Sequence, residues 1–270
     1  MLTLAATPIG NLEDISQRLA RVLAEADYIF AEDTRHSGKL LRQLGIHKPL
    51  SSFHEHSRPT VLERIGMLLR EGRNLVYISD AGMPGINDPG YRLVRLAHEV
   101  GAAVDAVPGP CAVINALVLS GLPCHEFAFL GFFPEKASQR QTLVDRLAGL
   151  QMTAVFFESP QRVGTTLRFL EERIPSTPIA VCREMTKLHQ EVIRGTPAEV
   201  VAVLENPRGE FTLVVGAVAE TENEPDLKQR FQTLSERGLS RSQAIRALAQ
   251  ERRMSKRQIQ RLLEVKTQGP

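Results

Sequence analysis

The first part of the chain alternates short apolar runs with amphipathic stretches, a pattern that predicts strands separated by helices. The strands are expected at residues 2–6, 28–31, 74–79 and 103–107, and the helices at 15–26, 35–44 and 91–100. Gly109-Pro110 opens a further helix to about Ser120, because proline is tolerated in a first helical turn. Strands that alternate with helices indicate a mostly parallel sheet with crossover helices.

A second α/β segment is predicted beyond Gly121-Leu122-Pro123, a tripeptide typical of a domain boundary. Its strands are expected at 127–133, 154–158, 179–183 and 211–216, and its helices at 140–150, 161–172 and 198–204. Residues 189–195 alternate like an added strand or hairpin arm, so the second sheet is expected to be mixed.

The end of the chain predicts a small helical unit after an acidic linker at 220–225. Ser240 can cap a helix that places Ile245 and Leu248 on one face, and a second short helix begins after Met254. Two short helices joined by a tight turn resemble a helix-turn-helix. The expected architecture is two α/β domains, residues 1–120 and 121–221, with a cofactor cleft between them and a helical unit at 222–270.

Charge is distributed unevenly along the chain. Residues 226–270 hold eleven basic and four acidic residues, a net charge of +7, whereas residues 1–219 have a net charge of −2. A basic tail is typical of a protein with a polyanionic partner, although a solvated helical surface has a similar composition.

Composition excludes several other classes. No run approaches the roughly 18 apolar residues of a membrane span, and no basic region precedes the first apolar residues as in a signal peptide. Three cysteines are too few for a disulfide framework or a zinc site. A cytoplasmic protein without a membrane role is expected.

Three loops rich in glycine and proline follow predicted strands. They are residues 6–11 (ATPIGN), 79–90 (SDAGMPGINDPG) and 108–112 (PGPCA). Such loops expose backbone N–H and C=O groups in a fixed geometry, and ligands of open α/β sheets bind at the strand ends. One such loop is adequately explained as a tight turn, but three favour a ligand site. The dinucleotide fingerprint, the P-loop and the nucleophile elbow are all missing.

Charged residues follow other predicted strands at 32–35, at Glu158 and at 183–187. Asp33 and Asp88 each precede a helical pattern and are expected to act as helix caps. The five mostly polar residues at 183–187 favour a functional role over an ordinary turn. His54-Glu55-His56 lacks a third nearby ligand, so no metal is expected.

Eight short blocks form an ordered series along the chain: ATPIGNLEDIS (6–16), AEDTR (31–35), SDAGMPGINDPG (79–90), VPGPCA (107–112), SGLP (120–123), FLGFFP (129–134), FFESPQR (156–162) and REMTK (183–187). This series resembles the tetrapyrrole-methylase superfamily, and in particular its members that methylate ribosomal RNA. The resemblance covers about residues 1–219 and extends to the basic tail. Met83 stands where threonine is commoner, and Cys111 where serine or threonine is.

The resemblance implies a homodimeric enzyme that binds S-adenosyl-L-methionine between its two α/β domains. It implies methylation of the ribose 2′-hydroxyl of a cytidine near the decoding site in 16S rRNA of the small ribosomal subunit. The residues implied to line the cofactor, largely through backbone groups, are Pro8, Asp80, Ala81, Gly82, Met83, Pro84, Ile86, Ala112 and Leu130.

A ribose hydroxyl needs a base, or a charge that stabilises the developing alkoxide. The candidates are Lys187, whose pKa is expected to fall in a desolvated cleft, and the carboxylates Glu32, Asp33 and Glu158. Arg35 and Arg183 are candidates for holding RNA phosphate. The tail residues expected to hold the RNA backbone are Arg241, Arg246, Arg252, Arg253, Lys256, Arg257 and Arg261.

Two other functional classes stay open at this point. A methyltransferase acting on small tetrapyrroles would share the fold, but it would have no use for the basic tail. It is also expected to carry a shorter Gly-Asp-Pro turn in place of SDAGMPGINDPG. A non-enzymatic ribosome-assembly factor would need the tail, but not three loops suited to a ligand.

Overall fold

The computed structural model describes residues 1–205, 207–218, 227–251 and 255–264. The chain divides into two compact units, residues 1–218 and 219–270. The first unit holds two sheets: the strands of one precede residue 120 in the sequence, and the strands of the other follow it. The domain boundary expected at this residue stays a prediction. Within the described ranges, the helices are too short or too polar to cross a membrane.

The first sheet has five strands, all parallel, in the order β3-β2-β4-β1-β5. The strands are β1 (Leu2–Ala5), β2 (Tyr28–Ala31), β3 (Leu50–Ser52), β4 (Leu75–Ile78) and β5 (Val104–Val107). Their central members are buried on both faces, which explains why they read as continuous apolar runs rather than as alternating ones. The parallel sheet predicted from the pattern is confirmed.

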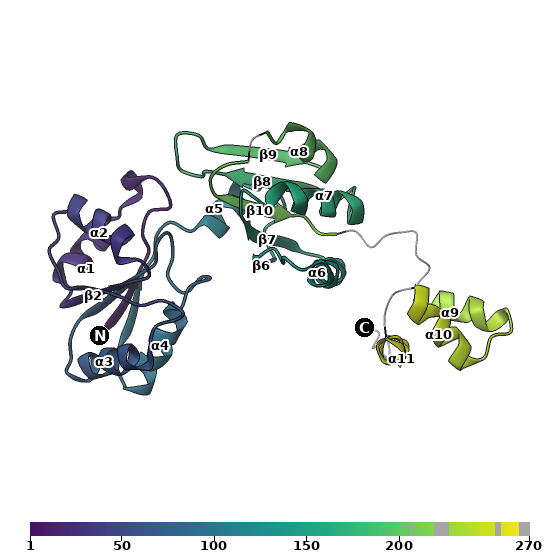
Figure 1. Ribbon diagram of the computed structural model, residues 1–270, viewed down its shortest axis with the longest axis horizontal. Coiled ribbons are helices and arrows are strands. Elements are labelled where there is room, and N and C mark those ends of the chain that lie inside the picture. Colours follow the sequence, from purple (N-terminus) through teal and green to yellow (C-terminus); the bar gives the residue numbers. More distant parts are fainter. Residues whose placement is uncertain (206, 219–226, 252–254, 265–270) are drawn as a thin grey trace. The chain divides into compact units, whose positions relative to one another are not determined.

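Helices cover both faces of this sheet (Figure 1). Leu2 and Leu4 face α3 (Pro59–Arg70) and α4 (Gly90–Glu99), while Ala5 faces α1 (Gln17–Glu25) and α2 (Thr34–Gln43). A 3₁₀ turn, η1 (Leu12–Asp14), lies between β1 and α1. Because successive residues of a strand point to opposite faces, each strand contributes to both cores.

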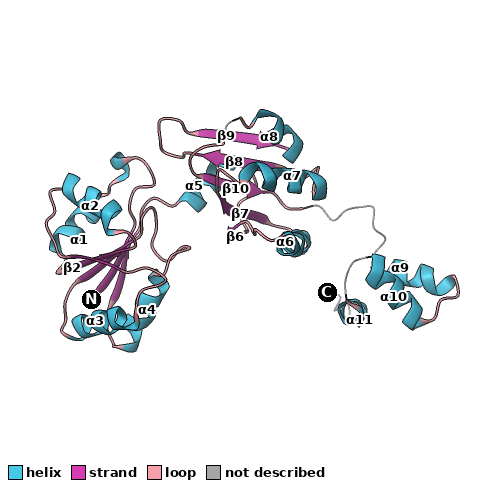
Figure 2. Ribbon diagram, in the orientation of Figure 1, coloured by secondary structure: helices cyan, strands magenta, loops and turns pink. Residues whose placement is uncertain are grey.

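The second sheet is mixed, as predicted. Its order is β6-β7-β10-β8-β9, and β6 pairs with β7 in parallel while the other neighbours are antiparallel (Figure 2). The strands are β6 (Phe127–Phe132), β7 (Thr153–Glu158), β8 (Ile179–Arg183), β9 (Glu191–Gly195) and β10 (Phe211–Val215).

One face of the second sheet packs against α5 (Ala112–Ser120) through Val113, Ala116 and Leu117. The other face is covered by α6 (Ala137–Leu150), α7 (Val163–Arg173) and α8 (Pro197–Val203). Helix α5 follows directly from the loop after β5. It therefore links the carboxyl end of a strand in the first sheet to the second sheet, against which it packs.

The unit at the end of the chain contains α9 (Leu227–Glu236), α10 (Arg241–Glu251) and α11 (Lys256–Glu264) around an apolar core. Ser240 caps α10 as predicted, since its Oγ accepts from the Gln243 N–H at 3.3 Å. The Gln243 side chain accepts from the Ser240 N–H at 2.9 Å in return. Two helices were expected here, and α9 adds a third.

Candidate active site

The three Gly/Pro-rich loops lie together at the carboxyl ends of neighbouring strands β4, β1 and β5. Thr7 and Gly82 exchange two backbone hydrogen bonds, of 3.0 and 3.1 Å. The Thr7 hydroxyl also donates to the Ser79 carbonyl at 3.4 Å, and the Ala6 N–H donates to the Val107 carbonyl at 3.1 Å. The loop at 79–90 is therefore joined to the first loop by backbone as well as side-chain contacts.

Glycine is required where these loops approach one another. Gly82 has a left-handed φ of 81°, and a Cβ there would lie 3.3 Å from Ile9 Cγ2. A Cβ on Gly109 would lie 2.9 Å from the Cβ of Ala6, closer than carbon atoms pack. At both positions, therefore, the glycine backbone packs directly against a side chain of the first loop.

A hollow of about 370 Å³, here called the central hollow, connects these loops to the second sheet. The loops contribute Ile9, Ala81 and Ala112. The second sheet and its loops contribute Phe132, Phe157, Glu158, Ser159, Pro160, Met185, Gly209, Glu210, Phe211 and Thr212. Its size and mostly apolar lining are those of a small-molecule site.

The residues expected to line a cofactor divide between two hollows. Ala81 and Ala112 line the central hollow, whereas Pro8 and Asp80 line a second one of about 320 Å³ beside α2. Leu130 packs its side chain against the core on the α6–α7 face, so a binding role would fall to its backbone. The remaining expected residues, which line neither hollow although they share a loop with Ala81, are Gly82, Met83, Pro84 and Ile86.

Three carboxylates, those of Glu32, Asp80 and Asp88, gather in the loops that follow β2 and β4. Asp80 accepts from the Asp33 N–H at 2.9 Å, and Asp88 accepts from the N–H groups of Gly85 and Gly90, both at 2.7 Å. Burial, together with the charges of Asp80 and Asp88, raises the pKa of the Glu32 carboxyl above its usual value. Among the described residues, no three His, Cys, Asp or Glu side chains are placed to hold a metal ion.

The two capping predictions have different outcomes. Asp33 is the N-cap of α2, and its side chain accepts from the Arg35 N–H at 2.8 Å. Asp88 bonds the first N–H of α4, but the N-cap itself is Pro89, which makes no side-chain cap bond. Hydrogen bonds from Arg35 lower the pKa of Asp33 to about 2, so this carboxylate is a weak base.

The expectation that the pKa of Lys187 falls is wrong. Burial does favour the neutral amine, but Nζ donates to Glu184 at 2.9 Å and to Glu210 at 3.1 Å. These two carboxylates outweigh the burial and raise the pKa of Lys187 above its usual value. Lys187 is therefore a fixed cation and not a poised base.

The loop that carries Lys187 has an unusual backbone. Glu184 and Thr186 adopt left-handed φ values of 48° and 66°, a conformation that is rare for a β-branched residue such as threonine. The loop also meets the first Gly/Pro-rich loop, since a Cβ on Gly10 would lie 2.5 Å from Lys187 Cγ. Strained non-glycine residues cluster at functional sites, which supports the functional role predicted for this segment.

Glu158 is held by three donors at the end of β7. Its carboxylate accepts from Arg162 at 2.6 Å, from the Ser159 N–H at 2.8 Å and from the Thr166 hydroxyl at 2.6 Å. Its side chain is completely buried, whereas Arg162 also pairs with the exposed Glu135 at 3.0 Å. These contacts favour a positioning role for Glu158 rather than proton transfer.

The basic residues expected to hold RNA occupy different environments. Arg35 is exposed but bound to Asp33. Arg183 donates to the Arg208 carbonyl at 2.9 Å and lies over the Phe211 ring. The tail residues with exposed side chains are Arg241, Arg246, Lys256 and Arg257. Arg252, Arg253 and the side chain of Arg261 lie outside the described residues.

Among the residues at the site that were not named as candidates are Phe132, Arg162 and Glu210, while Met185 was included only as part of the segment 183–187. Glu210 reaches Lys187 only because β10 pairs with β8, a pairing invisible in the sequence. Phe132, Arg162 and Met185 do lie within the blocks FLGFFP, FFESPQR and REMTK that carry the family resemblance, and their place in these blocks was the available signal.

Residues 1–201 match the family model of the tetrapyrrole (corrin/porphyrin) methylases. Relatives named ribosomal RNA small subunit methyltransferase I match between 79% and 100% of the chain. The relative from Synechocystis sp. is 41% identical over 100% of this chain and 99% of its own length. The relative from Bacillus subtilis is 36% identical over 96% and 92%. The relative from Thermotoga maritima is 45% identical over 79% of this chain and 97% of its own length.

Two solved structures share the fold. Uroporphyrin-III-C-methyltransferase from Thermus thermophilus matches 80% of this chain and 94% of its own, with a TM-score of 0.56 and 22% identity. The methyltransferase CobJ matches 83% and 97%, with a TM-score of 0.57 and 20% identity. The resemblance inferred from the eight blocks is confirmed. The chain is an S-adenosylmethionine-dependent methyltransferase that belongs to the tetrapyrrole methylase family, within the group named ribosomal RNA small subunit methyltransferase I.

Proposed function

We propose that this enzyme methylates the ribose 2′-hydroxyl of a cytidine in 16S rRNA of the small ribosomal subunit. The observation that carries the proposal is its likeness to the ribosomal RNA methyltransferases over almost the full length of both chains. An enzyme with this substrate would work in the cytoplasm, where ribosomal subunits are assembled.

The central hollow is the proposed place of S-adenosylmethionine. Ile9, Ala81, Ala112 and Met185 give it apolar walls, and the three loops around it offer backbone groups for polar contacts. When bound, the cofactor supplies a methyl group that its sulfonium centre has already activated. The protein's main task is then to hold the ribose oxygen in line with the bond that breaks.

Glu32 is the best proton acceptor among the four candidates. Its raised pKa brings it closer to the pH at which the enzyme works, which favours general-base catalysis. The low pKa of Asp33 and the three donors on Glu158 argue against those carboxylates. The role assigned to Lys187 is to stabilise negative charge that develops on the ribose oxygen, because it remains protonated.

The basic unit at the end of the chain is proposed to add affinity for RNA rather than chemistry. The Thermotoga maritima relative carries the same name, yet it leaves about a fifth of this chain unmatched. Residues 219–270 form a compact unit of about that share, and their exposed cations suit an RNA backbone.

Homodimer formation is part of the proposal. Ile114 and Val118 on α5 have exposed fractions of 46% and 69%, which is typical of apolar side chains that a second subunit covers. The oligomeric state measured by light scattering tests this point separately from the activity.

The function is tested by incubating the purified enzyme with labelled S-adenosylmethionine and small ribosomal subunits that lack the modification. We expect label in 16S rRNA. Transfer to a tetrapyrrole but not to RNA would support the small-molecule alternative, and binding to subunits without any transfer would support an assembly factor.

A further inference from the structure

Strand β6 contains a bulge that changes which face Phe132 occupies. The pairing register with β7 shifts between Phe129 and Phe132, and Gly131 has a left-handed φ of 70°. In a regular strand, residues three apart point to opposite faces. Here both phenylalanines contact Phe157, with ring centroids 4.9 and 5.7 Å away. The bulge therefore turns Phe132 toward the face that holds the central hollow, as bulges beside active sites do.

The side chain of Phe132 is 52% exposed, although Phe157 covers part of it in an edge-to-face contact. The following residue, Phe133, turns to the other face and is buried against Phe156. Burying a phenylalanine side chain stabilises a fold, because it removes a large apolar surface from water. A bulge that keeps Phe132 in solvent forgoes that gain, so packing does not explain its position.

Phe132 separates two hollows. It lines the central hollow and also a wider one of about 700 Å³, here called the edge hollow. Ser159 is the other residue common to both. A ligand group that rests on Phe132 therefore lies next to the place proposed for the cofactor.

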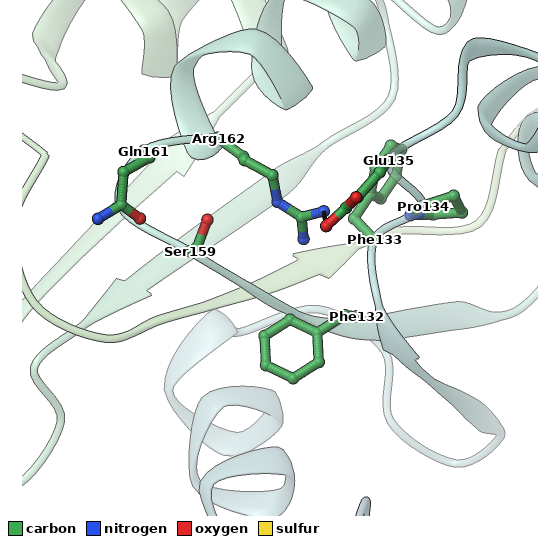
Figure 3. Close-up of a pocket in the computed structure, with 7 residues that line it drawn as sticks. All are labelled: Phe132, Phe133, Pro134, Glu135, Ser159, Gln161 and Arg162. Atoms are coloured by element: carbon green, nitrogen blue, oxygen red, sulfur yellow. Dashed lines mark ion pairs between the residues drawn. The ribbon is translucent and has the colours of Figure 1, made fainter.

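The edge hollow carries both donors and acceptors. Figure 3 shows the Arg162 side chain extending toward Glu135, with which it pairs at 3.0 Å. Gln161 adds an amide to the lining, and Ser159 adds a hydroxyl. A nucleobase has flat apolar faces and an edge that both donates and accepts hydrogen bonds. The combination of an exposed aromatic ring with mixed polar groups suits such a ligand.

We propose that Phe132 is the platform on which the base of the target nucleotide stacks after it leaves the RNA structure. The base edge then faces the polar groups of the edge hollow, and the attached ribose lies toward the central hollow. This inference rests on the proposed function, since it assigns a contact to the same RNA substrate. Enzymes that modify one nucleotide commonly extrude it and stack its base on aromatic side chains.

The test compares three variants in single-turnover methyl transfer to small subunits that lack the modification. Phe132→Leu keeps an apolar side chain but removes the ring, and Phe132→Tyr keeps the ring. Phe127→Leu is the matched control, because Phe127 lies on the same strand, is 37% exposed, and lines neither hollow. Affinity for S-adenosylmethionine is measured by calorimetry for each variant.

Loss of one base-stacking contact is expected to lower kcat/KM of Phe132→Leu by about 5- to 150-fold. Phe132→Tyr, which keeps the stacking ring, is expected to lose far less than Phe132→Leu. Phe127→Leu is expected to stay close to the wild type, and all variants should bind S-adenosylmethionine normally. Near wild-type transfer by Phe132→Leu would overturn the inference, as would an equal loss in Phe132→Tyr or a matching loss of cofactor affinity. If the unaltered enzyme transferred no methyl group, the proposed function would fail first and this inference with it.

Discussion

Removing the carboxylate of Glu158 should destabilise the first unit far more than removing the other carboxylate that binds Arg162. Glu158 and Glu135 both pair with Arg162, at 2.6 and 3.0 Å. Their side chains differ in exposure, which is 0% for Glu158 and 81% for Glu135. The two residues therefore form a matched pair in which burial is the main difference.

The expected magnitude follows from what each substitution leaves behind. Glu158→Ala leaves the Thr166 hydroxyl and the Ser159 N–H without their acceptor, and it removes one of two partners of Arg162. Breaking a buried ion pair costs roughly 3–5 kcal/mol. Because Arg162 keeps Glu135, we expect the lower end, about 3 kcal/mol. Glu135→Ala removes an exposed pair and should cost less than about 1 kcal/mol.

The assay is thermal and urea unfolding of both variants beside the wild type. For a unit of this size, about 3 kcal/mol corresponds to a decrease in Tm of roughly 6–12 °C. The isosteric variant Glu158→Gln should lose less stability and retain methyl transfer, because the role proposed for Glu158 is positioning rather than proton transfer. Equal losses for Glu158→Ala and Glu135→Ala would refute the reasoning, and a folded but inactive Glu158→Gln would return Glu158 to the catalytic candidates.

Four further predictions concern the site and the tail. Gly10→Ala places a Cβ 2.5 Å from Lys187 Cγ, which must displace Lys187, so this variant should lower kcat. The control Gly164→Ala has open space around the new Cβ and should leave kcat unchanged. Equal rates for the two variants would show that the position of Lys187 does not matter for the reaction. The raised pKa of Glu32 means that activity should fall as the pH drops through that pKa, and Glu32→Gln should be slow without this acid limb. The same shift means that the charged Glu32 carboxylate destabilises the folded state at neutral pH, so Glu32→Gln should raise Tm at pH 7. Below about pH 4 the carboxyl is protonated in both the folded and the unfolded state, so the substitution should not raise Tm there. A gain in Tm at every pH would contradict this reasoning. Deleting residues 219–270 should weaken RNA binding and reduce its salt dependence, by roughly 0.7–0.9 per lost phosphate contact, while S-adenosylmethionine binding persists; an unchanged salt slope would exclude the tail from RNA binding.

Much of the fold could be predicted because buried strands and amphipathic helices have distinct patterns. The strands β1, β2, β4 and β5 were expected within two residues of their observed bounds. Two elements between them, β3 and α3, were missed. Strand β3 is a three-residue, partly exposed strand (LSS) at the edge of the sheet, too short to show a pattern. Helix α3 does bury Ile65, Leu68 and Leu69 on one face, so its signal was present in the sequence.

The site was predictable only where a single loop carries the signal. The three Gly/Pro-rich loops follow their strands directly, and parallel strands bring them to one edge of the sheet. The charge state of Lys187 depends on Glu210, which a strand pairing brings from far along the chain. The exposure of Phe132 depends on a change of register, and sequence alternation alone would place this side chain on the opposite face.

The proposed reaction transfers a methyl group to a ribose 2′-oxygen in the small subunit. It is tested most directly by mass spectrometry of nucleosides from 16S rRNA, after small subunits lacking the modification react with enzyme and isotopically labelled S-adenosylmethionine. We expect one labelled methyl group per subunit, carried as 2′-O-methylcytidine and mapping to the decoding region. Label on a base, on another nucleoside, or absent from RNA while the enzyme binds S-adenosylmethionine would contradict it.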